Sequence, residues 1–219
     1  MAELRSDFRD HGPRWFAWLA AGTLVLAALA VYWNSLGAPF VFDDIPAVER
    51  NATIRQLWPP WPALNPPTDG SGVSGRPLVN LSLAVNHAMG GEEVRGYHLT
   101  NIALHALAAL TLWGLLRRTL RLDSVGLPLD GRPGSIRGEA RRQAPALHDD
   151  AGLMAFVCAL LWTVHPLLTE SVVCVVQRNE IMGSLFYLLT LYCFVRGVHS
   201  TSSRQAQGSC SGALRAPDG

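Results

Sequence analysis

The sequence is poor in charge and has no lysine. Only 16% of its 219 residues are charged, whereas soluble domains carry about 25%. All 18 basic residues are arginine, which we attribute to coding bias because most of them lie in predicted loops. Since 49% of the residues are hydrophobic, the composition predicts a membrane protein, and it indicates no nucleic-acid partner.

Cysteine is scarce as well, and its spacing does not indicate a metal site. No CxxC or CxxH pair occurs among the four cysteines, Cys158, Cys174, Cys193 and Cys210. Three of them lie in or beside apolar segments, where cysteine is most often a small core residue. A cysteine-based metal centre is therefore unsupported.

Four apolar stretches indicate membrane spans, at residues 15–33, 97–116, 151–168 and 181–195. The first holds about 19 uncharged residues with an aromatic residue near each end, enough to cross a bilayer. A cleaved signal peptide is the rival interpretation, which the lack of a small-residue cleavage site after Tyr32 disfavours. The fourth stretch is short. We predict an all-α, multi-pass transmembrane region over 15–196, between a cytoplasmic N-terminus, 1–14, and a disordered polar tail, 197–219.

Arginine placement sets the predicted orientation. Residues 117–150 hold seven arginines, whereas residues 34–96 hold four arginines against six acids. Because arginine is enriched on the cytoplasmic side, we expect 117–150 in the cytoplasm and the loops 34–96 and 169–180 on the outer face. The first outer loop contains the triplets that begin at Asn51 and Asn80, which are N-glycosylation acceptors in a eukaryotic lumen but are also common by chance.

An aspartate pair, Asp43 and Asp44, follows Phe40-Val41-Phe42 about ten residues beyond the first span. Two adjacent carboxylates cannot both ionise freely in a site with little water, so one of them suits a general base. The alternative is a pair that caps a turn before Pro46.

A second candidate group begins at His165, whose neighbour Pro166 suits the first turn of a helix. Offsets of four and eight place Cys174 and Arg178 on the same face of that helix as Glu170. We expect this short helix to lie on the outer membrane face and to present Glu170 and Arg178 to the same cavity as the aspartates. The alternative is an ordinary solvated face, which the cost of ionisable groups at membrane depth disfavours.

The second span carries polar residues on one helix face. His98, Asn101 and His105 recur at offsets of three and seven. Polar side chains at such positions either bond a neighbouring helix or line a cavity. Packing is slightly favoured for His105, which lies deepest.

Arg76 is a further candidate. It precedes a half-apolar stretch that is typical of an amphipathic surface helix. A cation at this place could hold a phosphate through charge-assisted hydrogen bonds. Anchoring to the lipid surface explains the pattern equally well.

Five motifs follow one another along residues 39–197: Phe-Val-Phe-Asp-Asp, Gly-Arg-Pro-Leu-Val-Asn-Leu-Ser-Leu, Gly-Tyr-His-Leu-Thr-Asn-Ile-Ala-Leu-His, His-Pro-Leu-Leu-Thr-Glu-Ser-Val and Val-Gln-Arg-Asn-Glu. Their order resembles the N-terminal part of the tetratricopeptide-repeat membrane glycosyltransferases, which include the transmembrane O-mannosyltransferases of animals and many bacterial relatives. The resemblance implies a GT-C fold with its active site at the outer face. It implies transfer of a sugar, with mannose as one candidate, from a polyprenyl-phosphate donor to a hydroxyl, often on a protein.

The resemblance also assigns roles to residues. The family's motifs fall on Asp43, Asp44, His165, Glu170, Arg178 and Glu180. It implies that Asp44 or Asp43 takes the acceptor proton, while Arg178 or Arg76 stabilises the leaving lipid phosphate. His98 and Asn101 join the donor or cavity group. Neither a metal nor another cofactor is implied, and the expected partners are donor, acceptor and membrane lipid.

The chain departs from the family in two respects. It has about half of the family's membrane helices, and it contains no 34-residue repeat. Whether the chain alone is active therefore stays open. The alternative is a non-catalytic membrane subunit or truncated remnant that mediates protein interactions, and a transporter-like fragment is a second rival. The last motif favours a bacterial inner membrane over the endoplasmic reticulum.

Overall fold

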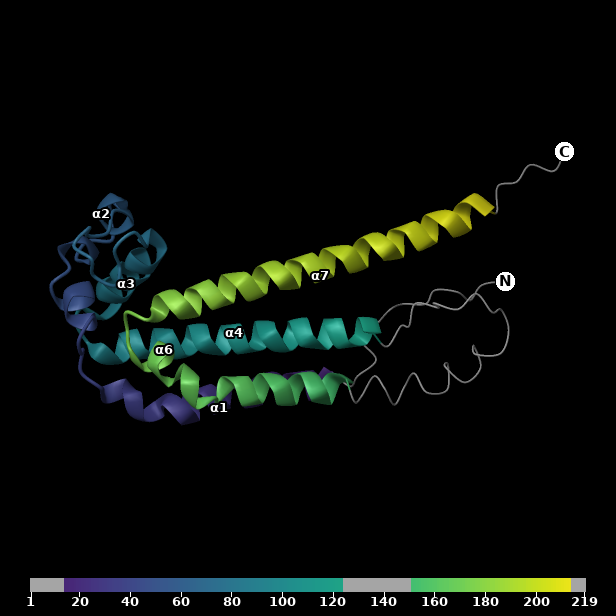
Figure 1. The fold of residues 1–219 in the computed structure, drawn as a ribbon, viewed down its shortest axis with the longest axis horizontal. Coiled ribbons are helices and arrows are strands. Elements are labelled where there is room, and N and C mark those ends of the chain that lie inside the picture. The colour runs from purple at the N-terminus through teal and green to yellow at the C-terminus, as the bar shows by residue number, and fades with distance from the viewer. Residues whose placement is uncertain (1–13, 124–150, 214–219) are drawn as a thin grey trace.

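The structure is a computed structural model that describes residues 14–123 and 151–213. Long helices lie side by side along one direction, and short helices and turns gather at one end of them (Figure 1). The described ranges contain helices and connecting turns but no strand, so the predicted all-α fold is confirmed.

Helix α4, Val94–Asp123, is central to the long helices. It packs against α1, Arg14–Tyr32, and along the first part of α7, Arg178–Ala213. A further helix, Ala151–Thr163, shares a buried apolar cluster with α1 and α4. The residues of this cluster are Ala20, Leu24, Trp113, Ala155 and Ala159.

Two helical stretches are long and apolar enough to cross a membrane, Trp15–Gly37 and Val94–Leu120. A third would result if Ala151–Thr163 and Pro166–Val173 formed one broken span, since the two pieces meet at a bend of 50°. The described part of the chain is thus helical with two or three candidate spans. The predicted fourth span, 181–195, lies inside α7.

The bend in the third candidate span follows from one proline. Pro166 restricts the residue before it to extended backbone, and His165 has φ −68° and ψ 129°. The chain resumes as a short 3-10 helix, Pro166–Leu168, and the His165 Nδ1 accepts a hydrogen bond from the Leu167 N–H at 3.3 Å. His165 therefore caps this turn, as a residue before a helix often does.

The predicted helix through Glu170 and Arg178 is interrupted. Helix α6 covers only Thr169–Val173, and Cys174 is extended with φ −75° and ψ 121°. At the break the Asn101 amide donates to the carbonyls of Val172 and Cys174, which supplies partners for carbonyls at the end of the helix. Glu170 is consequently exposed while Arg178 is buried, so the expectation that both face one cavity is wrong.

Residues 38–93 form a folded lobe at the end of the bundle where α4 and α7 begin (Figure 1). Its elements are a π-helical turn Ile45–Glu49 (η2), a 3-10 turn Ala52–Ile54 (η3), α2, Trp61–Leu64, and α3, Pro77–Gly90. Buried side chains from this lobe share one core with Tyr97 of α4 and with Val175 and Val176. The stretch expected as an outer loop is therefore packed onto the helices.

Two asparagines join the parts of the lobe. The Asn51 Nδ2 donates to the Asn80 Oδ1 at 2.8 Å and to the Ala47 carbonyl at 2.9 Å. The Asn80 Nδ2 donates to the Ala63 carbonyl and to the Thr53 hydroxyl, both at 2.8 Å. Both asparagines are buried, and a glycan on either nitrogen would break these bonds. In the folded lobe these triplets are structural.

Helix α7 extends into the stretch predicted as a polar tail. We predict a disordered tail over 197–219; α7 extends as far as Ala213, and 214–219 lie outside the described residues. A helix that has already formed adds residues at little cost, because only the first turn must be nucleated. The stretch from Arg196 to Ala213 also contains no proline that would stop it.

The predicted orientation can be tested at the exposed Asp69 of the lobe. Asp69→Asn creates the acceptor triplet Asn-Gly-Ser at an exposed site, because Gly70 and Ser71 follow it. We expect one additional glycan on this variant after synthesis in microsomes, seen as a glycosidase-sensitive increase in mass. Asp69→Gln, which creates no triplet, is the control. An unmodified Asp69→Asn chain would place the lobe on the cytoplasmic side.

Candidate functional site

Arg178, the first residue of α7, is a fully buried cation with 0% exposure. Its Nε donates to the Asn101 Oδ1 at 2.7 Å, and Nη2 donates to the Tyr97 carbonyl at 3.0 Å. Nη1 donates to the Asn86 Oδ1 at 2.7 Å and to the Ser82 hydroxyl at 3.2 Å. All four acceptors are neutral. They replace the hydration of the guanidinium, which burial would otherwise make costly.

The Arg178 network joins three helices at the end of the bundle. Ser82 and Asn86 come from α3, whereas Tyr97 and Asn101 come from α4. Asn86 is itself oriented, because its amide nitrogen donates to the Thr100 hydroxyl at 2.8 Å. The guanidinium is therefore enclosed and has no surface on which a phosphate could bind in this arrangement.

Asp44 and Asp43 differ in burial. The Asp44 side chain is 1% exposed and accepts a hydrogen bond from the Val176 N–H at 2.8 Å, whereas the Asp43 side chain is exposed. The turn between Val41 and Asp44 separates them, since the Asp44 N–H bonds the Val41 carbonyl at 2.9 Å. The sequence placed both acids at one site, and the structure leaves only Asp43 open to solvent.

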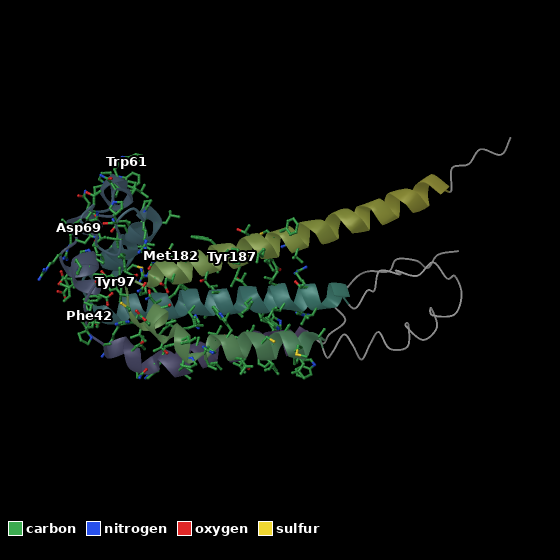
Figure 2. The ribbon with its side chains drawn as sticks, viewed as in Figure 1. Phe42, Trp61, Asp69, Tyr97, Met182 and Tyr187 are labelled. Carbon is green, nitrogen blue, oxygen red and sulfur yellow. The ribbon has the colours of Figure 1, made fainter. Side chains whose placement is uncertain are left out.

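The residue before the pair has a backbone conformation that is rare for a side chain of its size. Phe42 has φ +47° and is 87% exposed. Phe40, two residues earlier, is buried and meets the Tyr97 ring edge to face at 5.3 Å. Figure 2 shows Phe42 and Tyr97 at the end of the bundle where α4 begins. Packing of Phe40 thus anchors the turn that exposes Asp43.

The Cys174 thiol lies beside the buried carboxylate. Its Sγ donates to the Asp44 Oδ1 at 3.5 Å. Burial raises the pKa of the Cys174 thiol to about 11, and the negative charge of Asp44 contributes in the same direction. The thiol is therefore protonated at neutral pH and acts as a second donor to Asp44.

The polar face of α4 is used for packing. The Asn101 Nδ2 donates to the Val172 and Cys174 carbonyls at 3.2 and 3.1 Å. The His98 Nε2 lies 3.0 Å from the Ala38 carbonyl. The His105 Nε2 lies 2.9 Å from the Thr163 carbonyl, and its ring stacks on Trp162 at 5.0 Å. The favoured packing interpretation of His105 agrees with this geometry.

Arg76 is exposed at the start of α3. Its Nη1 donates to the Gly72 carbonyl at 2.6 Å. It also donates to the Asn179 Oδ1 at 3.1 Å when that amide is oriented so that both of its ends have partners. The sequence identified Arg76 but not Gly72 or Asn179. The signal available for Asn179 was a polar residue beside the arginine of the last motif.

The remaining predicted residues lie on the surface: His165 and Glu170 in the segment between the helix Ala151–Thr163 and α7, and Glu180 in the first turn of α7. His165, Glu170 and Glu180 are all exposed. The Glu180 Oε2 accepts a hydrogen bond from the Ser171 hydroxyl at 2.7 Å. Within residues 14–123 and 151–213, no cluster of three histidine, cysteine, aspartate or glutamate side chains could hold a metal ion.

Comparison with known proteins finds relatives that are named protein O-mannosyl-transferases. The chain is 32% identical over 77% of its length to protein O-mannosyl-transferase TMTC2 of Mus musculus, and it covers 18% of that protein. It is 32% identical over 80% of its length to Tmtc3 of Drosophila melanogaster, covering 19%, and 29% identical over 95% to TMTC4 of Mus musculus, covering 27%. The chain is homologous to these O-mannosyl-transferases. No family model and no solved structure matches it.

The resemblance to the O-mannosyl-transferase family inferred from five motifs is confirmed by these matches. The chain spans about a fifth to a quarter of the length of the relatives named here. Arg178, buried in the structure, is the arginine of the last of these motifs.

Removal of the buried guanidinium should destabilise the bundle. Arg178→Ala leaves the amide oxygens of Asn86 and Asn101 buried without donors, and we expect a loss of about 3 kcal/mol in the free energy of unfolding. Denaturation of the purified chain in detergent would measure it. Arg50→Ala, which removes an exposed arginine of the lobe, should change stability little. Normal stability of Arg178→Ala would show that the network is not structural.

The Cys174 thiol should give the fold a pH dependence. Because its pKa is raised on folding, its contribution is fully present below pH 9 and is lost as the pH rises from 9 to 11. We expect the unfolding midpoint of the parent chain to fall over this window by more than that of Cys174→Ala. Parallel curves for the two chains would contradict the assignment.

Proposed function

We propose that this chain forms the outer-face part of a membrane glycosyltransferase that transfers a sugar from a polyprenyl-phosphate carrier to a hydroxyl on a protein. Mannose is the proposed sugar, since the relatives are named protein O-mannosyl-transferases. The supporting observation is that Asp43 and Arg76 are the exposed members of their candidate pairs and lie on a lobe at the end of helices of membrane-crossing length. A lipid-linked donor would present its phosphate at that level of the bilayer.

The proposed step is a displacement at the anomeric carbon. The acceptor oxygen forms a bond to that carbon while the bond to the phosphate oxygen breaks and the lipid phosphate leaves with the electron pair. The acceptor proton passes to the carboxylate of Asp43, which acts as general base. Arg76 balances the charge that develops on the departing phosphate.

The structure favours one member of each pair of candidates. Asp44 already accepts hydrogen bonds from Val176 and Cys174 and is closed to solvent, so we assign it to holding the turn that carries Asp43. Arg178 is enclosed by neutral acceptors, so we assign the phosphate to Arg76. These assignments are part of the proposal.

The membrane location, the side of the membrane on which the lobe lies, and the kind of membrane rest on different observations. A membrane location agrees with the apolar helices and with the relatives. The lobe on the lumenal or periplasmic side is proposed from the arginine distribution. A bacterial inner membrane stays a prediction, and the relatives named above come from animals.

A second function is supported by the enclosed networks. Asp44 and Arg178 are both buried and hydrogen-bonded within the chain. A non-catalytic membrane subunit that binds protein partners would need no open acid. The two functions differ in whether the lobe engages a lipid-linked sugar.

Loss of the proposed base should abolish transfer without loss of the fold. In membranes that contain the chain, labelled polyprenyl-phosphate mannose and an acceptor peptide, we expect Asp43→Asn to lower the transfer rate about 100-fold or more. Glu49→Gln, which removes another exposed acid of the lobe, should leave the rate unchanged. Equal transfer by Asp43→Asn would reject the base. A parent chain that inserts but neither binds donor nor transfers would favour the non-catalytic subunit.

A further inference from the structure

Arg76 is held by one of its nitrogens only. Nη1 donates to the Gly72 carbonyl and to the Asn179 Oδ1, which accounts for both of its hydrogens. Among the residues that the structure describes, neither Nε nor Nη2 of Arg76 has a hydrogen bond. The edge formed by these two nitrogens is therefore free, and such an edge binds phosphate oxygens in bidentate geometry.

The positive charge of Arg76 is not cancelled. Within the described ranges no carboxylate lies within ion-pair distance of it, whereas Arg55 of the same lobe pairs with Glu92. Both groups that hold Arg76 are neutral oxygens. Neutral acceptors fix the direction of a guanidinium and leave its charge available for an anion.

The two acceptors of Arg76 are positioned by a single residue. The Asn179 Nδ2 donates to the Val176 carbonyl at 2.8 Å. Gly72 lies so close to Val176 that a Cβ added at Gly72 would be 2.4 Å from the Val176 Cγ2. The N–H of the same Val176 binds Asp44. Val176 thus contacts both residues that hold Arg76 and also binds Asp44 of the aspartate pair.

We propose that Asn179 and Gly72 are positioning residues that hold the Arg76 guanidinium with its Nε and Nη2 edge open to the phosphate of the lipid-linked donor. The proposal rests on the proposed function and adds the residues that determine donor binding. Without these contacts the guanidinium would sample many rotamers, and ordering it would weaken each binding event. Asn179 lies next to the buried Arg178, so its place in the first turn of α7 is rigid.

The alternative is a structural role, in which Arg76 only holds the loop at Gly72 in place, like a staple. The substitution Asn179→Asp distinguishes this role from anion binding. Asn179→Asp loses the N–H that donates to the Val176 carbonyl but keeps an oxygen that accepts from Arg76, so the contact that holds Arg76 to Asn179 would be preserved. The same change brings a carboxylate against the guanidinium and cancels its charge, which would weaken an anion site. Asn179→Ala removes the acceptor and keeps the charge.

The test is binding of radiolabelled undecaprenyl monophosphate to the full chain in detergent, together with the thermal unfolding midpoint of each variant. We expect Asn179→Ala to weaken binding about fivefold, as loss of one aligning hydrogen bond would. Asn179→Asp should weaken it at least as much, with a midpoint no lower than that of Asn179→Ala, because both variants lose the donor to the Val176 carbonyl and only the aspartate keeps an acceptor for Arg76. Asn65→Ala and Asn65→Asp make the same changes at an exposed asparagine of the lobe that does not contact Arg76, and both should bind normally.

Each other result has a definite meaning. Normal binding by Asn179→Asp would overturn the positioning role and favour a staple. Binding that Arg76→Gln weakens but neither Asn179 variant affects would overturn this inference alone and keep Arg76 as the phosphate residue. A parent chain that binds no polyprenyl phosphate would overturn the proposed function and this inference with it.

Discussion

The burial of one guanidinium governs the arrangement of the lobe on the helices. Arg178 has lost its contact with water, and burial of such a charge is costly unless hydrogen-bond acceptors replace the lost hydration. Its four acceptors come from α3 and α4, while Arg178 itself begins α7. The three helices must therefore meet at one place, and the lobe that contains α3 is oriented by the same contacts.

Hydrogen bonds connect the residues around Arg178 to the candidate site. In the turn before Arg178, the Val176 N–H donates to Asp44 and the Val176 carbonyl accepts from the Asn179 Nδ2. The Asn179 Oδ1 in turn accepts from Arg76. The Asn101 amide donates to the carbonyls of Val172, near the end of α6, and of Cys174, just before the turn. The polar residues of the motifs thus divide into buried ones that shape the turn and exposed ones that the turn presents to a ligand.

The lobe is held together by its own hydrogen bonds and apolar core, unlike a flexible loop. Asn51 and Asn80 bridge η2, η3, α2 and α3 with buried hydrogen bonds. Phe40 and Val48 pack with Tyr97 into the core that continues onto α4. The exposed Asp43 consequently lies on a rigid support, and a rigid support is what allows a general base to be held near a reacting hydroxyl.

The sequence by itself determined the first two long apolar helices and the list of polar candidates. Apolar length and the proline at Pro166 act locally, so the spans and the break at His165 follow from neighbouring residues. Only the tertiary structure decided that Asp44 and Arg178 are buried and that Asp43 and Arg76 are exposed. The partner of Asp44 lies 132 positions away in the chain, and the acceptors of Arg178 lie 77 to 96 positions away. No local pattern specifies such partners, because they exist only once the helices have packed.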